Sequence, residues 1–190
     1  MRLKDEHKLN AIIRATLELT NEKGLAGIRM SDLAKRAGIA TGSLYTYFED
    51  KQNLLLSVNR SVRSTAARYL RHQFREEDTL EHRLEHTVKR YVDYVGEHRE
   101  AILFADLLKR SPYMTEAASQ ETMDHFQFLL DMVEEGQQSG MIRTGDPEEL
   151  LHVMDSIVKA MVDFQLFHGR PYTKNIQQRT WGIVRSALIG

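Results

Sequence analysis

The sequence predicts an all-α protein with a small three-helix N-terminal head and a larger C-terminal helical bundle. Apolar residues recur at helical spacing through most of the 190 residues, and no segment shows the alternation of a strand. The clearest breaks in this pattern are Ser111-Pro112 and the glycine-containing stretch 140–147. With 42% hydrophobic residues the chain can bury a substantial core.

The head begins with a helix whose apolar residues share one face and which stops at Lys23-Gly24. A short helix then ends at Gly38, and a second short helix follows after the segment AGIA. Glu49 and Asp50 are acidic groups suited to the start of a longer fourth helix. The expected ranges are 9–23, 31–37, 41–48 and 49–74.

The second half alternates long amphipathic stretches with short breaks. The segment DPEE is a well-formed helix start, with Asp146 as the cap, Pro147 in the first turn and Glu149 completing the capping arrangement. The expected helices are 79–96, 98–110, 114–138, 147–168 and 174–188.

Composition excludes several classes of function. The chain has no cysteine, so disulfides, thiolate metal sites and cysteine nucleophiles are impossible. His82 and His86 stand one turn apart but lack an evident third ligand, and neither a phosphate-binding glycine loop nor a nucleophile elbow occurs. Apolar runs are too short to span a bilayer. We expect a soluble cytoplasmic protein that is not an enzyme and holds no metal or cofactor.

Net charge is −1, but it divides unevenly along the chain. Residues 1–60 carry ten Lys and Arg against seven Asp and Glu, whereas residues 61–190 carry sixteen against twenty. This asymmetry has the sign expected if the head approaches a polyanion.

The two short helices joined by AGIA have the dimensions of a helix-turn-helix. On a helical wheel Leu44 and Phe48 form the buried side of the second short helix. Gly42, Ser43 and Thr46 point the opposite way, and Tyr45 and Tyr47 flank the edges. Small groups at the centre allow the backbone to approach base edges, and tyrosine hydroxyls can reach phosphates or bases. Lys51 and the free amides of the next helix would then bind the adjacent phosphate.

These residues resemble the DNA-binding signature of TetR/AcrR-type transcriptional repressors. The resemblance runs without gaps through IIRATLELTNEKG and MSDLAKRAGIATGSLYTYFEDKQNLL, and EEGQQSGMIRTGDPEELLHVM resembles the loop before the family's penultimate helix. The matching positions are Ile12, Ala15, Leu19, Gly24, Asp32, Leu33, Ala34, Ala37, Gly38, Gly42, Leu44, Tyr45, Phe48, Lys51 and Leu54.

The resemblance implies about nine helices, a DNA-binding domain over 1–50 and a ligand-binding and dimerisation domain over 51–190. It further implies a homodimer on a palindromic double-stranded DNA operator, released by a small molecule bound in the bundle. The family usually has a capping Thr where this chain has Arg29, a capping Ser at Ala40 and Phe at Thr20, so we expect differently satisfied helix starts and a repacked head. The expected DNA contacts are Arg29, Ser31, Thr41, Gly42, Ser43, Tyr45, Tyr47 and Lys51.

Two further sets of residues are candidates for function in the bundle. Soft and aromatic residues either fill the helical core or line a cavity for an apolar ligand, and the pocket candidates are Tyr91, Tyr94, Phe104, Met123, Phe126, Met132, Met161 and Phe164. Apolar stripes on the last two helices either pack inward or pair with a second copy. The dimer candidates are Met154, Ile157, Met161, Trp181, Val184 and Leu188.

The main alternative is a helical small-molecule binding protein whose head no longer binds DNA. A helical enzyme is a third interpretation, which no convergent set of catalytic residues supports.

Overall fold

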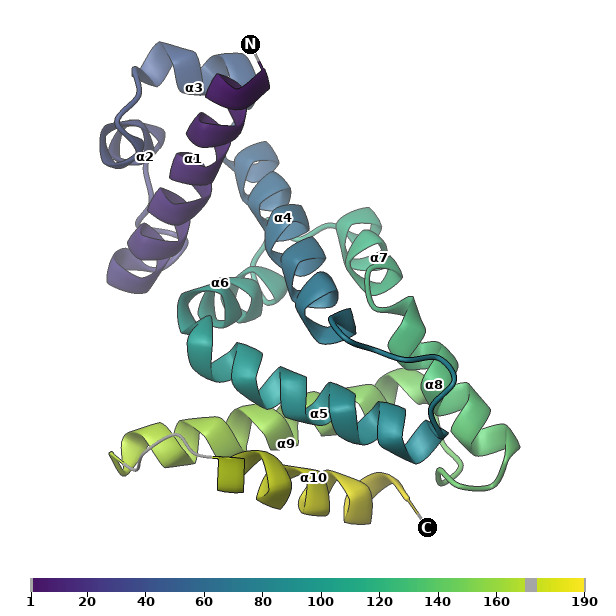
Figure 1. The fold of residues 1–190 in the computed structure, drawn as a ribbon. Coiled ribbons are helices and arrows are strands. Elements are labelled where there is room, and N and C mark those ends of the chain that lie inside the picture. Colours follow the sequence, from purple (N-terminus) through teal and green to yellow (C-terminus); the bar gives the residue numbers. More distant parts are fainter. Residues whose placement is uncertain (1, 170–173, 190) are drawn as a thin grey trace. The chain divides into compact units, whose positions relative to one another are not determined.

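A computed structural model describes residues 2–169 and 174–189 and confirms the all-α prediction (Figure 1). These described residues form ten helices, joined by turns and loops. The helices are α1 (Arg2–Lys23), α2 (Met30–Ala37), α3 (Thr41–Tyr47), α4 (Lys51–Arg71), α5 (Leu80–Glu97), α6 (Arg99–Lys109), α7 (Glu116–Asp124), α8 (Gln127–Gln138), α9 (Pro147–Phe167) and α10 (Lys174–Leu188).

The single helix expected over 114–138 is wrong, because the chain breaks between α7 and α8. The backbone of Phe126 leaves the helical conformation, and its N–H donates to the carbonyl oxygen of Met123 at 2.8 Å in a tight turn. The sequence has no glycine or proline at this point, so local residue type gave no signal of the break.

The chain folds into two compact units, and the functional domain boundary expected at residue 50 stays a prediction. The first contains Met1–Ser64 and Arg99–Thr122, and the second contains Thr65–His98 and Met123–Gly190. Helix α4 therefore contributes residues to both units.

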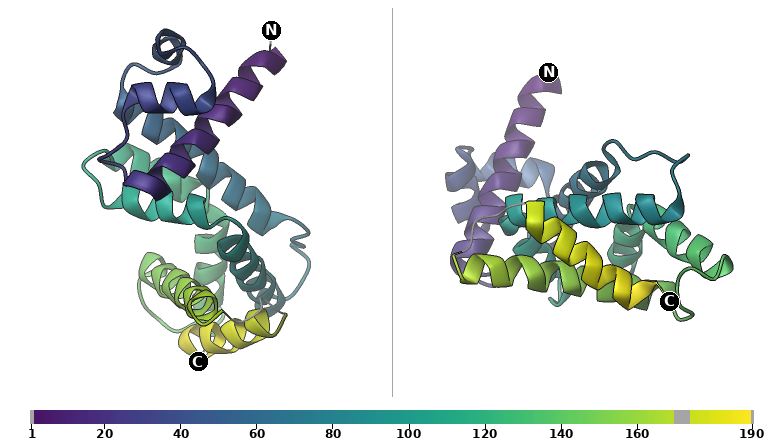
Figure 2. Two further views of the ribbon diagram at one scale, coloured as in Figure 1. Left: turned by 90° about the vertical axis from the view of Figure 1, so that its left-hand side faces the viewer. Right: turned by 60° about the horizontal axis from the view of Figure 1, so that its bottom comes forward.

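The first unit packs α1 to α3, the start of α4 and α6 around one apolar core. Helix α6 packs beside α1, as Figures 1 and 2 show. Thr16 and Thr20 are buried on α1, and each hydroxyl donates to a carbonyl one turn earlier, at 2.8 and 2.7 Å. The core residues are Ile12, Ala15, Leu19, Leu25, Ile28, Leu33, Ala34, Leu44, Phe48, Leu54, Leu55, Val58, Val62, Ala101, Phe104 and Leu108.

The second unit packs α5 against α8, α9 and α10, and α9 runs beside α10 (Figure 2). The Asp146 carboxylate accepts from the N–H groups of Glu148 and Glu149 at 2.8 and 3.3 Å, which confirms the predicted cap of α9. The loop before it is tied to the end of α10, where Arg143 N–H donates to the Leu188 carbonyl oxygen at 3.0 Å.

Candidate nucleic-acid interface

The turn between α2 and α3 is set by Gly38. This residue has φ 69°, a left-handed conformation that favours glycine, and its N–H donates to the last carbonyls of α2. The N–H of Ile39 adds a 3.0 Å bond to the Ala34 carbonyl oxygen, so α2 ends sharply. Helix α3 then begins at Thr41 after a very short connection.

Helix α3 presents two different faces, as its sequence predicts. Leu44 and Phe48 are buried, at 0% and 6% exposure, while Tyr45 and Tyr47 are 53% and 41% exposed. A Cβ added to Gly42 would meet no atom within 4 Å, so the backbone there is open to a partner. The prediction that Leu44 and Phe48 form the buried face of this helix is confirmed.

The remaining expected contact residues differ in exposure. Arg29, Ser31 and Thr41 are exposed, whereas Ser43 is half-buried and its carbonyl oxygen accepts from the Thr46 hydroxyl at 2.6 Å. Neither Arg29 nor Ala40 makes a side-chain capping bond, as the substitutions at these positions predicted. DNA contact by these residues stays a prediction.

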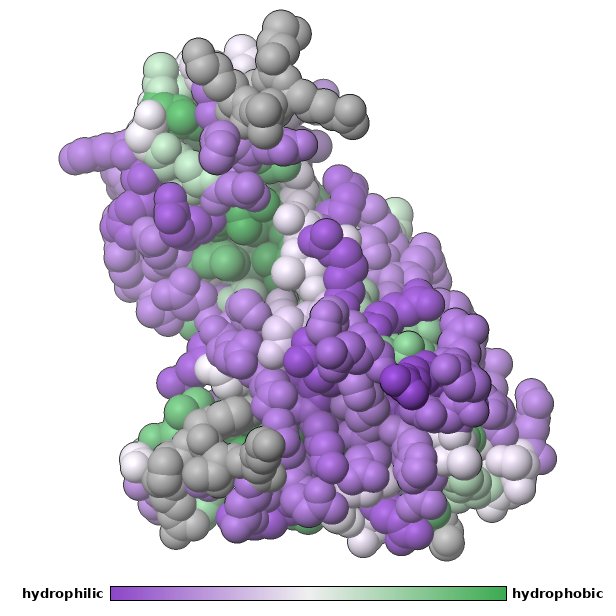
Figure 3. Space-filling model, in the orientation of Figure 1, coloured by the Kyte–Doolittle hydropathy of each residue, from purple (hydrophilic) through white to green (hydrophobic). Residues whose placement is uncertain are grey.

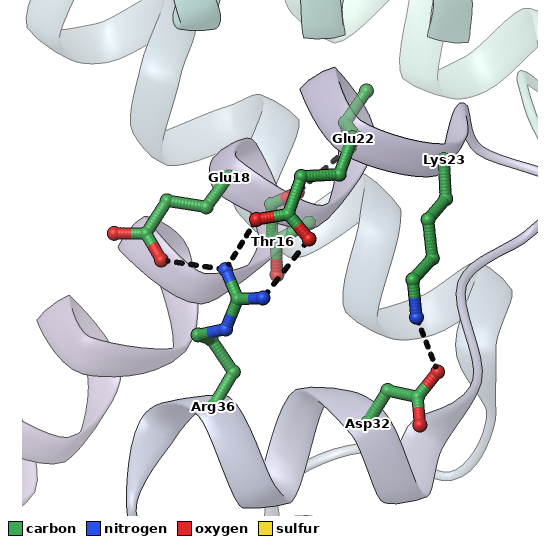
Figure 4. Close-up of polar contacts among 7 residues, drawn as sticks. Thr16, Glu18, Glu22, Lys23, Asp32 and Arg36 are labelled. Carbon is green, nitrogen blue, oxygen red and sulfur yellow. Dashed lines mark hydrogen bonds and ion pairs between the residues drawn. The ribbon is translucent and has the colours of Figure 1, made fainter.

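Ion pairs join α2 to α1 (Figure 4). Arg36 on α2 donates from both Nη1 and Nη2 of its guanidinium to the Glu22 carboxylate at 2.9 Å, and Nη1 also donates to Glu18 at 3.1 Å. Hydrogen bonding by Arg36 lowers the pKa of Glu22, and the same bond raises the pKa of Arg36. Lys23 and Asp32 form a second α1–α2 pair at 3.2 Å. Two of the head's cations are therefore committed to its own scaffold.

Lys35 is a candidate that the sequence interpretation missed. It lies exposed on α2 and, among the described residues, forms no ion pair. Arg29 shares both properties. Arg29 and Lys35 differ from Arg36 and Lys23 only in the folded chain, where the latter two have acidic partners. The sequence alone does not distinguish the four cations.

Lys51 is half-buried rather than projecting from the start of α4. Its ammonium donates to the Ala26 carbonyl oxygen at 3.4 Å and lies 5.1 Å from the centre of the Tyr113 ring. The predicted phosphate ligand therefore has partners within the chain.

The expected pocket residues are divided between the two compact units, and a ligand pocket formed by them stays a prediction. Phe104 belongs to the core of the first unit, Tyr94 is buried against Tyr69 in the second, and Phe164 is 46% exposed. The Tyr91 hydroxyl donates to the Asp155 carboxylate. Met123 and Phe126 flank the break between α7 and α8, Met132 is buried on α8 and Met161 is half-buried on α9.

A surface hollow of about 520 Å³ lies elsewhere in the second unit. It is lined by Gln73, Phe74, Arg75 and His86, none of which was expected to line a pocket. His86 Nε2 lies 3.0 Å from the His72 carbonyl oxygen. Among the described residues, no group of three His, Asp or Glu side chains could hold a metal ion.

Four of the six expected dimer residues are buried within the single chain, and their role in a dimer stays a prediction. Met154, Trp181, Val184 and Leu188 are buried within the second unit, so they have little surface to offer a partner. Ile157 and Met161 are half-buried. The apolar residues that α9 and α10 expose are others, namely Val153, Phe164, Phe167 and Ile183. The stripe on each helix faces inward because the two helices and α5 pack together.

The described helices include none long and apolar enough to cross a membrane.

A helix-turn-helix in which α3 is buried on one face and exposed on the other is typical of helix-turn-helix transcription regulators. Comparison with known families agrees. The family "Bacterial regulatory proteins, tetR family" matches residues 12–58, and "Tetracyclin repressor-like, C-terminal domain" matches residues 58–186. The chain belongs to the TetR family.

Individual relatives show how far the similarity extends. A fatty acid metabolism regulator protein of Bacillus subtilis (strain 168) is 28% identical over 140 residues, which cover 73% of this chain and 72% of the relative. The regulator BetI of Escherichia coli (strain K12 / DH10B) is 42% identical over 53 residues, covering only 28% of this chain and 27% of BetI.

Two solved structures share the fold across nearly the whole chain. A TetR family transcription regulator from Marinobacter aquaeolei VT8 has a TM-score of 0.92 at 23% identity, covering 100% of this chain and 99% of that one. FadR of Bacillus subtilis in complex with stearoyl-CoA has a TM-score of 0.72 at 20% identity, covering 93% and 97%.

The α1–α2 ion pairs predict a pH-dependent stability. Because the folded-state pKa of Glu22 lies below the ordinary value of 4.5, its bond to Arg36 stabilises the head above that value. The contribution is lost as the pH falls through the lowered pKa of the folded state. We expect R36Q to lower the Tm modestly at pH 7, since the pair is exposed, and the difference from wild type to shrink below pH 4.5.

Thermal denaturation followed by circular dichroism at a series of pH values measures this difference. K35Q is the matched control, because it also removes one exposed cation from α2 without breaking an ion pair. A Tm difference for R36Q that does not change with pH would contradict the assignment.

Proposed function

We propose that this protein is a ligand-responsive repressor that binds a palindromic DNA operator as a homodimer and is released by a small molecule bound in its C-terminal bundle. The observation that carries DNA binding is α3, whose buried Leu44 and Phe48 leave Gly42, Tyr45 and Tyr47 on an open surface. A helix held from behind with small groups at its centre can approach base edges in a major groove.

The dimer is proposed through the exposed apolar side chains of α9 and α10. Val153 and Ile183 are 43% and 45% exposed, and Phe164 and Phe167 are 46% and 86% exposed. Apolar side chains also reach the surface at the C-terminal end of α9 in Figure 3. A second copy of the same surface would bury these groups and supply a second head for the other half of a palindrome.

Long-chain acyl-CoA is the first effector class to test. Support comes from the name of the Bacillus subtilis relative, which regulates fatty acid metabolism, and from the stearoyl-CoA complex of a protein with the same fold. The methionine and aromatic side chains of the second unit can adapt to an acyl chain.

DNA binding is tested by titrating the protein with fragments from its own upstream region over a range of salt concentrations. Wild type should bind with a strong salt dependence. Y45A should weaken DNA binding by about five-fold or more, which corresponds to the loss of roughly one net hydrogen bond. Its effect on folding should be small, because the Tyr45 side chain is 53% exposed.

Y45F keeps the ring and removes only the hydroxyl, so loss of the hydrogen bond predicts that it weakens DNA binding about as much as Y45A does. Unfolding of the head by Y45A, with no separate effect on DNA binding, would mean that Tyr45 is a packing residue. Absence of wild-type binding to any upstream fragment at low salt would overturn the proposed function.

The dimer is tested by placing a charge on its proposed surface. I183E should convert the protein to a monomer, measured by light scattering after gel filtration, because burying an unpaired carboxylate is costly. DNA affinity should fall with it. L103E places the same charge on α6 at a residue of similar exposure, 38% against 45%, and should remain dimeric. A dimeric I183E would assign the interface elsewhere.

The effector class is tested by adding oleoyl-CoA to the protein–DNA complex. Release of DNA and a raised Tm of the free protein are expected, since a ligand at a hundred times its Kd stabilises the folded state by about 2.7 kcal/mol. Oleate and free CoA are the comparison ligands. Equal effects of free CoA and oleoyl-CoA would argue against recognition of the acyl chain.

A further inference from the structure

The first turn of α4 is held by two loops of its own compact unit. Lys51 Nζ donates to the Ala26 carbonyl oxygen in the α1–α2 loop at 3.4 Å and lies 5.1 Å from the centre of the Tyr113 ring. The next residue, Gln52, donates from its side-chain amide to the Tyr113 carbonyl oxygen at 3.1 Å. Both the ring and the backbone of Tyr113 therefore contact the start of α4.

Tyr113 is itself held in a fixed turn. Its N–H donates to the Ser111 hydroxyl at 3.2 Å, and that hydroxyl donates to the Leu108 carbonyl oxygen at 2.9 Å. Leu108 is fully buried at the end of α6. The Tyr113 side chain also packs against the apolar core of the unit, so Lys51 is not its only contact.

The position of the ring bears on what Lys51 can do. The chain enters α4 directly after α3, and the segment between α6 and α7 lies further along α4 than α3 does (Figure 1). The Lys51 ammonium therefore has two partners within its own unit, the Ala26 carbonyl oxygen and the Tyr113 ring, which a phosphate would have to replace. A cation over a ring face at this distance is attracted to it even at an exposed site.

We propose that Tyr113 is a positioning residue that competes with DNA for Lys51. In the free protein the ring and the Ala26 carbonyl hold the ammonium, and on binding a phosphate takes it over. Tyr113 then lowers DNA affinity without touching DNA. This proposal rests on the proposed DNA-binding function.

A double-mutant cycle on the full-length protein tests the competition, with affinity for mixed-sequence DNA measured over a low-salt series. Y113L should bind about two- to five-fold tighter than wild type, which corresponds to the strength of an exposed cation–π contact. K51A should weaken binding and reduce the slope of log K against log salt by about 0.9. Adding Y113L to K51A should change nothing further.

Y113F is the matched control, because it keeps the ring and both backbone hydrogen bonds of residue 113. It should bind DNA as wild type does. Equal weakening by Y113L in both backgrounds would make Tyr113 a purely structural residue and overturn the proposal. Weakening by Y113L only where Lys51 is present would mean that the ring presents the lysine to DNA, which also overturns competition.

A second measurement needs no DNA. With lysine labelled by ¹³C, the ε-methylene protons of Lys51, assigned from their absence in K51A, should be shifted upfield by the Tyr113 ring. The shift should persist in Y113F, disappear in Y113L and disappear from wild type when DNA is added. An unshifted signal in free wild type would overturn the proposal.

These readouts separate the two ideas. If wild type fails to bind DNA but shows the ring-current shift, the proposed function fails while the contact between Lys51 and Tyr113 stands, and competition for DNA fails with the function. If wild type binds DNA and Lys51 shows no ring-current shift, only the competition fails.

Discussion

The recognition surface depends on the burial of two side chains, Leu44 and Phe48. Helix α3 has seven residues, far fewer than an isolated helix needs to be stable in water. It also lacks a side-chain cap at Ala40. Burial of each large apolar side chain contributes about 1.5–3 kcal/mol, so these two contacts outweigh a missing cap of about 1 kcal/mol. The open face exists because the opposite face is anchored.

The head has fewer cations available to bind phosphate than its composition indicates. Arg36 and Lys23 neutralise acidic groups on the neighbouring helix, and Lys51 lies against a carbonyl and an aromatic ring. Arg29 and Lys35 carry most of the remaining exposed positive charge of α2 and its N-terminus. Because non-specific affinity follows the number of phosphates neutralised, one such head would bind DNA weakly. This favours two heads acting together.

Sequence predicted best what local chemistry determines. Gly38 ends α2 because its left-handed backbone excludes most other residues, and Asp146 starts α9 because its carboxylate bonds the free N–H groups. Such features depend on residues within one turn. The faces of α3 were equally predictable, since Leu44 and Phe48 lie four residues apart on one side.

The features that sequence could not predict depend on partners distant in the chain. An amphipathic stripe looks the same whether its partner is α5 of the same subunit or a second copy, which is why Trp181 and Val184 were expected at a dimer surface and lie inside. The break at Phe126 carries no glycine or proline, and the partner of Lys51 is 62 positions away at Tyr113.

Lys51 shows what this limit means for function. A lysine at the start of a helix that follows a recognition helix is expected to bind phosphate, and its sequence context gives no reason to expect otherwise. The structure adds a backbone carbonyl and a ring that attract the same charge. One lysine ammonium adds about one phosphate contact to the DNA affinity. An internal cation–π contact of comparable strength can therefore offset a large part of what Lys51 adds to that affinity. We expect DNA affinity to depend on residues of the α6–α7 loop as well as on those of α2 and α3.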